Sequence, residues 1–182
     1  MDTHIQQRLD NLHSEDKAVQ NEAFFLFLAL TDQPVDWSYA VWDELVNDLR
    51  HSDNHRRAIA AQVLCNLAKS DPDQRILRDF DALLNVTRDE RFVTARHCLQ
   101  ALWKVGVIGD DQRQRLLEGL ERRFNECVSE KNCTLIRYDI LQSLRNVYEV
   151  APDEAIKAKA LQWIELEADP KYRKKYATLW RS

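Results

Sequence analysis

The chain has 182 residues, of which 45% are hydrophobic and 31% charged, with only 3 glycines and a formal net charge of -4. This length and composition fit one mostly helical domain, and the longest apolar run, Ala23 to Leu30, is far shorter than the roughly 20 residues that cross a bilayer. The residues Met1 to Gln7 lack the basic and apolar segments of a secretory signal, so we expect a cytoplasmic protein that does not enter a membrane.

A short helix over residues 2–12 is predicted first, and a closing helix over residues 170–180 is predicted last. Between them the apolar spacing predicts four helical pairs, which are 16–31 with 36–50, 54–70 with 74–87, 90–105 with 110–127, and 131–149 with 153–167. No segment alternates for long enough to predict a strand. The four prolines lie between the apolar runs, where a new helix is expected to begin.

The first helix of each pair repeats one pattern, a small residue followed by apolar residues three, four and seven positions later. The copies are Ala23-Leu26-Phe27-Leu30, Ala60-Val63-Leu64-Leu67, Ala95-Cys98-Leu99-Leu102 and a looser Arg137-Ile140-Leu141-Leu144. Their anchors lie 37, 35 and 42 residues apart. A period of this size predicts stacked helical hairpins, with repeats over about 14–50, 52–87, 88–127 and 129–167.

Three capping and packing motifs resemble those of the HEAT-repeat family. They are Asp16-x-x-Val19-x-x-x-Ala23, Asp53-x-x-Arg56-Arg57-x-x-Ala60 and Asp89-x-Arg91-x-x-x-Ala95. The resemblance covers about residues 14–167. It implies an all-α, right-handed α-solenoid in one domain over residues 1–182, with the second helices lining a concave face and short cap helices at both ends. The fourth repeat departs from the pattern, because Arg137 takes the small position and Cys133 and Thr134 replace an apolar–basic pair.

Charge is distributed unevenly along the chain. The first 50 residues hold 10 acidic and 3 basic residues, whereas residues 51–182 hold 20 acidic and 23 basic residues. Such an asymmetry can orient a charged partner. The small basic excess of the longer segment does not by itself predict a nucleic-acid-binding protein, because duplex affinity requires many basic groups on one face.

The residues that could carry catalysis are sparse. None of the five histidines is followed by Glu, so the repeated His-Glu pairs of HEAT-like di-iron hydroxylases are missing. The best metal candidate, His51-x-Asp53-x-His55, lies where Asp53 is expected to cap a helix. No phosphate-binding glycine loop or nucleophile elbow is present. We therefore expect no catalytic residue, no metal ligand and no cofactor.

The four cysteines show no regular pairing in the sequence. They are Cys65, Cys98, Cys127 and Cys133. Since Cys98 takes an aliphatic position of the repeat, we expect it to be buried and reduced, which agrees with a cytoplasmic protein.

A binding or scaffold module for a partner protein or peptide is the favoured function. Alignment of the second helices places Arg75 and Arg115 at equivalent exposed positions, and Trp and Arg are frequent in binding hot spots. The expected partner-binding residues are Arg75, Arg78, Arg115, Arg122, Trp37, Asp43 and Glu44.

Nucleic-acid binding is the alternative, because HEAT-like DNA-alkylation-repair glycosylases hold a duplex in a basic groove. The candidate phosphate contacts are Arg115, Arg122, Lys171, Arg173, Lys174 and Lys175. The acidic first repeat would repel a continuous duplex. An enzyme with a site in the concave groove is the least favoured class.

Overall fold

The computed structural model describes residues 3–181, and all regular secondary structure in them is helical, which confirms the all-α prediction. The chain divides into two compact units, Met1–Ala101 and Leu102–Ser182, and each unit is described by itself. The division falls inside the predicted third repeat. None of the helices within residues 3–181 is long and apolar enough to cross a membrane.

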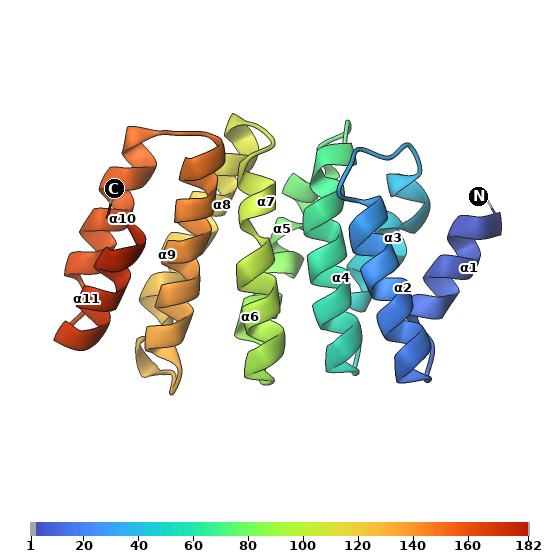
Figure 1. Cartoon of the computed structure of the whole chain (residues 1–182), viewed down its shortest axis with the longest axis horizontal. Coiled ribbons are helices and arrows are strands. Elements are labelled where there is room, and N and C mark those ends of the chain that lie inside the picture. The colour runs from blue at the N-terminus through green and yellow to red at the C-terminus, as the bar shows by residue number, and fades with distance from the viewer. Residues whose placement is uncertain (1–2, 182) are drawn as a thin grey trace. The chain divides into compact units, whose positions relative to one another are not determined.

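The first unit contains a short helix, two helical hairpins and a final helix (Figure 1). Its elements are α1 (Thr3–Leu12), α2 (Lys17–Leu30), α3 (Ser38–Asp48), α4 (Asn54–Leu67), η1 (Ala68–Ser70), α5 (Arg75–Asn85), η2 (Val86–Arg88) and α6 (Phe92–Ala101). The two η elements are 3-10 turns that extend α4 and α5. The bounds of α1 to α5 match the predicted helices to within three residues at each end.

Helix α4 lies at the centre of the first unit, where it packs against α2, α3 and α6. The helices α2, α4 and α6 form one layer, and α3 and α5 form a second layer behind it (Figure 1). The predicted core residues of α4 are buried, with Ala60, Val63 and Leu67 fully inaccessible and Leu64 1% exposed. The period of the sequence therefore predicts the apolar face of this helix correctly.

Aspartates cap the first helices of the first unit. The Asp16 carboxylate accepts hydrogen bonds from the backbone N–H groups of Ala18 and Val19, and the Asp53 carboxylate accepts one from His55. These bonds satisfy donors that have no partner within the helix. The aspartates of the repeated motif thus have the capping role that the sequence suggests.

One predicted core position is wrong. Leu26 is 39% exposed and its neighbour Phe25 is 66% exposed, whereas Ala23 and Phe27 of the same helix are buried. Helix α2 packs against α4 and against α1, a single helix of ten residues. The contacts of α2 with α1 and α4 leave the face that holds Leu26 uncovered in the first unit.

The second unit is built around its longest helix, α9, which contacts α7, α8, α10 and α11. Its elements are α7 (Trp103–Gly106), α8 (Asp110–Glu126), η3 (Cys127–Ser129), α9 (Cys133–Val150), α10 (Glu154–Glu165) and α11 (Pro170–Leu179). The predicted helix over 90–105 is interrupted at Leu102, so its two parts appear as α6 and α7. A Cβ atom added at Gly106 would lie 2.5 Å from Leu116 Cδ2 and 3.2 Å from Val147 Cγ2, so this glycine allows α7 to approach α8 and α9 closely.

The irregular fourth repeat keeps its core register. Ile140, Leu141 and Leu144 are fully buried, as the pattern predicts. Arg137 replaces the small residue without entering an apolar core, because its guanidinium lies 4.4 Å from the centroid of the Phe124 ring and 3.1 Å from the Glu167 carboxylate. The long side chain thus reaches polar and aromatic partners from a position that elsewhere holds alanine.

Candidate functional site

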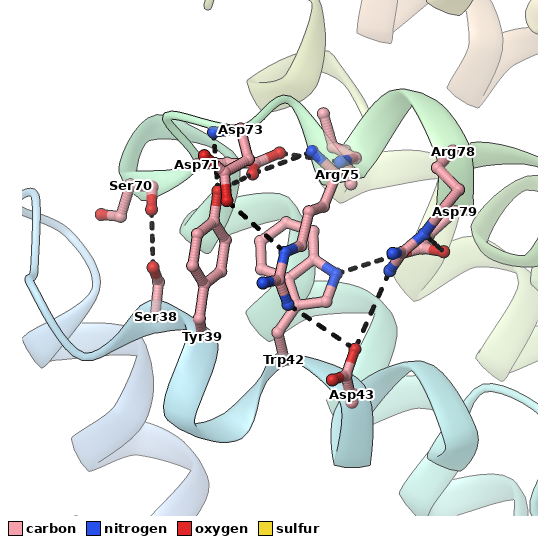
Figure 2. Close-up of polar contacts among 11 residues, drawn as sticks. Ser38, Tyr39, Trp42, Asp43, Ser70, Asp71, Asp73, Arg75, Arg78 and Asp79 are labelled. Carbon is pink, nitrogen blue, oxygen red and sulfur yellow. Dashed lines mark hydrogen bonds and ion pairs between the residues drawn. The ribbon is translucent and has the colours of Figure 1, made fainter. Parts of the chain in front are cut away.

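Three predicted binding residues, Asp43, Arg75 and Arg78, come together where α3 faces α5 (Figure 2). The inner part of this region is a set of short hydrogen bonds between the two hairpins. Ser38 Oγ donates to the Ser70 carbonyl oxygen at 2.6 Å, Tyr39 Oη donates to Asp71 at 2.6 Å, and Trp42 Nε1 donates to Asp79 at 2.9 Å. These bonds fix the aromatic side chains of α3 against the start of α5.

Asp71 is the residue that organises the beginning of α5. Its carboxylate accepts the backbone N–H groups of Arg75 at 2.9 Å and Ile76 at 2.7 Å, in addition to the Tyr39 hydroxyl. The Tyr39 hydroxyl in turn accepts the backbone N–H of Asp73 at 2.7 Å. Gln74, which lies between Asp73 and Arg75, has a φ of 55°, a left-handed conformation that costs a residue with a Cβ about 1 kcal/mol.

The outer part of the region consists of charged side chains, of which Asp43, Asp73 and Arg78 are exposed and Arg75 is half-buried. Arg75 lies over the Tyr39 ring, with its Cζ 3.8 Å from the ring centroid, and the Arg78 guanidinium makes two 2.8 Å bonds to Asp79. The Asp43 carboxylate lies 3.8 Å from each arginine, beyond hydrogen-bond distance. We call the eight residues of both parts the α3–α5 surface, namely Tyr39, Trp42, Asp43, Asp71, Asp73, Arg75, Arg78 and Asp79.

Electrostatic coupling is strong within this surface. Burial raises the pKa of Asp79, but the hydrogen bonds from Arg78 and Trp42 outweigh it, so the pKa of Asp79 lies below its ordinary value. The bond to Asp79 raises the pKa of Arg78. For Tyr39, burial and the bond to Asp71 raise the pKa of the hydroxyl. The Asp79 carboxylate therefore stays ionised and paired at neutral pH.

Glu44, also a predicted binding residue, belongs to a different cluster. It lies 3.1 Å from His13 Nδ1, while His13 Nε2 lies 2.7 Å from Asp48, and Arg56 contacts the same aspartate. Burial raises the pKa of Asp48, but the hydrogen bonds from His13 and Arg56 outweigh burial and lower it. This cluster ties α1 and α4 to the end of α3 and has a structural role.

Asp48→Asn is expected to remove an acid-sensitive part of the stability. Because the folded-state pKa of Asp48 is lowered, its contribution is present above the unfolded pKa of about 3.9 and is lost as pH falls through the folded value. The difference in unfolding free energy between wild type and variant should thus shrink as pH falls below about 4. Urea denaturation followed by circular dichroism at several pH values measures it, with the exposed Asp36→Asn as control. An equal difference at pH 7 and below pH 3 would contradict the assignment.

The other predicted binding residues lie outside the α3–α5 surface. Trp37 precedes α3, half-buried, with its ring edge-to-face on the core residue Phe27 at 5.8 Å, so it partly serves packing. Arg115 and Arg122 lie on α8 of the second unit. Sequence alignment alone relates Arg115 to Arg75.

The basic residues of α11 divide into two kinds. Arg173 turns back to donate two hydrogen bonds to the Glu167 carbonyl oxygen, and Lys175 lies 4.6 Å from the centroid of the Tyr138 ring. Lys171 and Lys174 are exposed. Two of the four candidate phosphate contacts on this helix are thus engaged within the unit.

The candidate metal motif lies at the start of α4. The Asp53 backbone N–H donates to His51 Nδ1 at 3.0 Å, and the Asp53 carboxylate caps the helix. Within residues 3–181, no three His, Cys, Asp or Glu side chains are grouped as metal ligands would be.

No protein-family model and no curated protein sequence matches the chain. Among solved structures, the chain is similar to two engineered proteins from a structural genomics consortium. The first has 17% identity and a TM-score of 0.50 over 96% of this chain, which spans only 46% of that protein's length. The second has 16% identity and a TM-score of 0.51, and the match covers 98% of this chain and 95% of that protein's length. At this identity the likeness concerns the helical fold alone.

Proposed function

We propose that the chain is a non-catalytic interaction module that binds a basic segment of a partner protein or peptide on the α3–α5 surface. The observation that carries the proposal is the contrast between the inner and outer contacts. The inner bonds are 2.6 to 2.9 Å long, whereas Asp43 and Asp73 reach arginines only at 3.8 and 3.9 Å with side chains 73% and 65% exposed. A partner cation could therefore bind these carboxylates without breaking a short bond.

The charge of the region favours a basic partner. The α3–α5 surface contains four aspartates and two arginines, and residues 1–101 hold 17 acidic against 11 basic residues. An acidic field attracts a basic segment and speeds its association. Tyr39 and Arg75 are of the residue types that dominate binding hot spots. Their mutual contact, and the packing of Tyr39 on the buried Trp42 ring, hold them in place before a partner arrives, so little ordering entropy is lost.

The strained turn supports the same proposal. Gln74, the one non-glycine residue with positive φ among residues 3–181, lies between Asp73 and Arg75. Residues in sparsely populated backbone conformations cluster at functional sites. The turn places the exposed Asp73 carboxylate beside Arg75 at the edge of the surface.

The finer fold prediction also belongs to this proposal. We infer a HEAT-like α-solenoid, in one repeat domain of a cytosolic protein, from the period of 35 to 42 residues and from the two-layer packing of hairpins in the first unit. Such a scaffold keeps its binding residues on rigid helices. The proposal requires no catalysis, cofactor or metal.

Asp43→Lys is expected to weaken binding of a basic peptide about tenfold or more, because it replaces an exposed carboxylate with a like charge. Fluorescence anisotropy with peptides of equal length and graded net charge measures the affinity. The control is Glu22→Lys on α2, which makes the same change of charge at another exposed site of the first unit.

Arg78→Gln tests whether the partner segment is basic or acidic. It removes a positive charge, so it should keep or strengthen binding of a basic peptide and would weaken that of an acidic one. The proposal of a basic partner would be contradicted if the wild type bound acidic peptides more tightly than basic ones and Arg78→Gln no longer bound the acidic peptides.

Nucleic-acid binding is the second candidate, and the exposure of Lys171 and Lys174 on α11 favours it. The second unit has 15 basic and 13 acidic residues, a small excess. A gel-shift experiment at low salt with a labelled duplex tests this candidate. A shift that is abolished by Lys171→Glu with Lys174→Glu would support it, and no shift at low salt removes it.

A further inference from the structure

The second unit contains two cysteines whose proximity neither the fold nor the proposed binding surface requires. Cys127 Sγ and Cys133 Sγ lie 2.7 Å apart. This separation exceeds the covalent S–S bond of about 2.0 Å by less than an ångström. None of the four cysteines, all of which lie within residues 3–181, forms a disulfide bond in the structure.

The turn between α8 and α9 directs the two sulfurs toward each other. Cys127 begins η3, and Cys133 is the first residue of α9. The backbone N–H of Glu130 donates to the Cys127 carbonyl at 2.8 Å, and the N–H of Cys133 donates to the Glu130 carbonyl at 3.1 Å. The Glu130 carboxylate also pairs with Arg123, which is 1% exposed, through contacts of 2.5 and 2.8 Å. The turn is thus fixed at both ends, and the pair is oriented before any reaction.

The two sulfurs differ in access to solvent. Cys127 is fully buried, whereas Cys133 is only half-buried. Cys133 and Thr134 are also the positions where the fourth repeat departs from the apolar–basic pattern, so repeat packing does not explain the presence of this thiol. We propose that Cys127 and Cys133 form a reversible intrachain disulfide by exchange with a small-molecule disulfide, with Cys133 as the attacking thiol.

The exchange balances in two steps. The Cys133 thiol loses its proton to solvent, and its sulfur attacks one sulfur of the oxidant, which forms a mixed disulfide and releases one thiol. Cys127 then loses its proton and attacks Cys133 Sγ, which forms the intrachain bond and releases the second thiol. The cysteine pair gives up two electrons and two protons in all, and the small disulfide is reduced to two thiols.

The closing step is expected to be the slower one near neutral pH. Burial, the largest cause, raises the pKa of Cys127 above its ordinary value, and this effect does not depend on the Cys133 thiol that the first step consumes. Since only the thiolate attacks, ring closure should accelerate as pH rises from 7 to 10. A mixed disulfide on Cys133 should therefore accumulate before the intrachain bond forms.

Oxidation of the full chain by glutathione disulfide tests the proposal. After alkylation of the remaining thiols and intact mass measurement, we expect a product that lacks about 2 Da and carries two fewer alkyl groups than the reduced chain. Peptide mapping should join Cys127 to Cys133. The buried pair Cys65 and Cys98 is the internal control and should remain alkylatable after unfolding.

Two serine variants assign the order of attack. Cys127→Ser should stop at a glutathione adduct on Cys133 of about 305 Da, whereas Cys133→Ser should gain neither the adduct nor the internal bond. Glutathione on Cys127 in the Cys133→Ser variant would overturn the assignment of Cys133. A wild-type chain that retains four alkylatable thiols at high glutathione disulfide would overturn the proposal, and mapping of wild type decides this even where a variant does not fold.

Discussion

Asp89→Ala is expected to lower the free energy of unfolding by about 3 kcal/mol or more. The Asp89 carboxylate makes a bidentate ion pair with Arg57, with distances of 2.5 and 3.0 Å and side chains 4% and 15% exposed. It also accepts the backbone N–H of Arg91 at 2.9 Å at the start of α6. Alanine removes the ion pair and the cap together, at the junction where α4 packs against α6.

Urea denaturation of both chains measures the loss. Asp89→Asn keeps an oxygen that can cap α6, so it should lose less than the alanine variant, by about the 1 kcal/mol of a helix cap. Glu90→Ala removes the neighbouring exposed carboxylate and is the matched control. Equal losses in Asp89→Ala and Glu90→Ala would show that the ion pair does not hold α4 to α6.

The sequence predicts what each repeat needs for its own packing. The apolar face of α4 and the capping aspartates Asp16 and Asp53 follow local rules, because helix periodicity and N-terminal donors involve residues within a few positions of one another. These features are confirmed. The prediction for Leu26 is wrong because its burial depends on which neighbouring helix covers each face of α2, and the repeat pattern does not specify this.

The contacts of the candidate site join residues one repeat apart. Tyr39 bonds to Asp71, Trp42 to Asp79 and Arg57 to Asp89, at separations of 32 and 37 residues. Alignment of the second helices predicts that Arg75 and Arg78 are exposed, which is correct for Arg78, whereas Arg75 is half-buried over the Tyr39 ring. The side chains that orient both arginines depend on the turn geometry around Gln74. A search for polar side chains that lie one repeat period apart in the sequence could have identified the hydrogen bond between Trp42 and Asp79.

The cysteine pair illustrates the same limit. A spacing of six residues across a turn does not predict that two sulfurs meet, because the result depends on the backbone bonds of Glu130 and on its pairing with Arg123. The sequence shows that the fourth repeat departs from the pattern at Cys133 and Arg137, but it does not show which residues these two side chains contact. In the structure both residues contact side chains from other elements, Cys127 and Glu167 respectively.

Trp42→Ala is expected to lower the free energy of unfolding by about 3–5 kcal/mol, because the indole is fully buried between the layers of the first unit. Trp42→Phe keeps most of the ring volume but removes the hydrogen bond to Asp79, and it should lose about 1–2 kcal/mol. Urea denaturation followed by circular dichroism measures both losses and separates cavity formation from loss of the bond.

The phenylalanine variant also links stability to the binding surface. The Trp42 bond helps to lower the pKa of Asp79, so its removal should raise that pKa. Asp79 should then contribute less to the free energy of unfolding at neutral pH, and this contribution is lost as pH falls through the folded pKa. A carbon-detected NMR titration of the Asp79 carboxyl measures the change. Asp79→Asn separates the two roles of this carboxylate, because the amide oxygen can still accept the Trp42 hydrogen bond whereas the ion pair with Arg78 is lost. If basic peptides bind this variant as tightly as they bind the wild type, the exposed carboxylates of Asp43 and Asp73 are sufficient to recognise the partner.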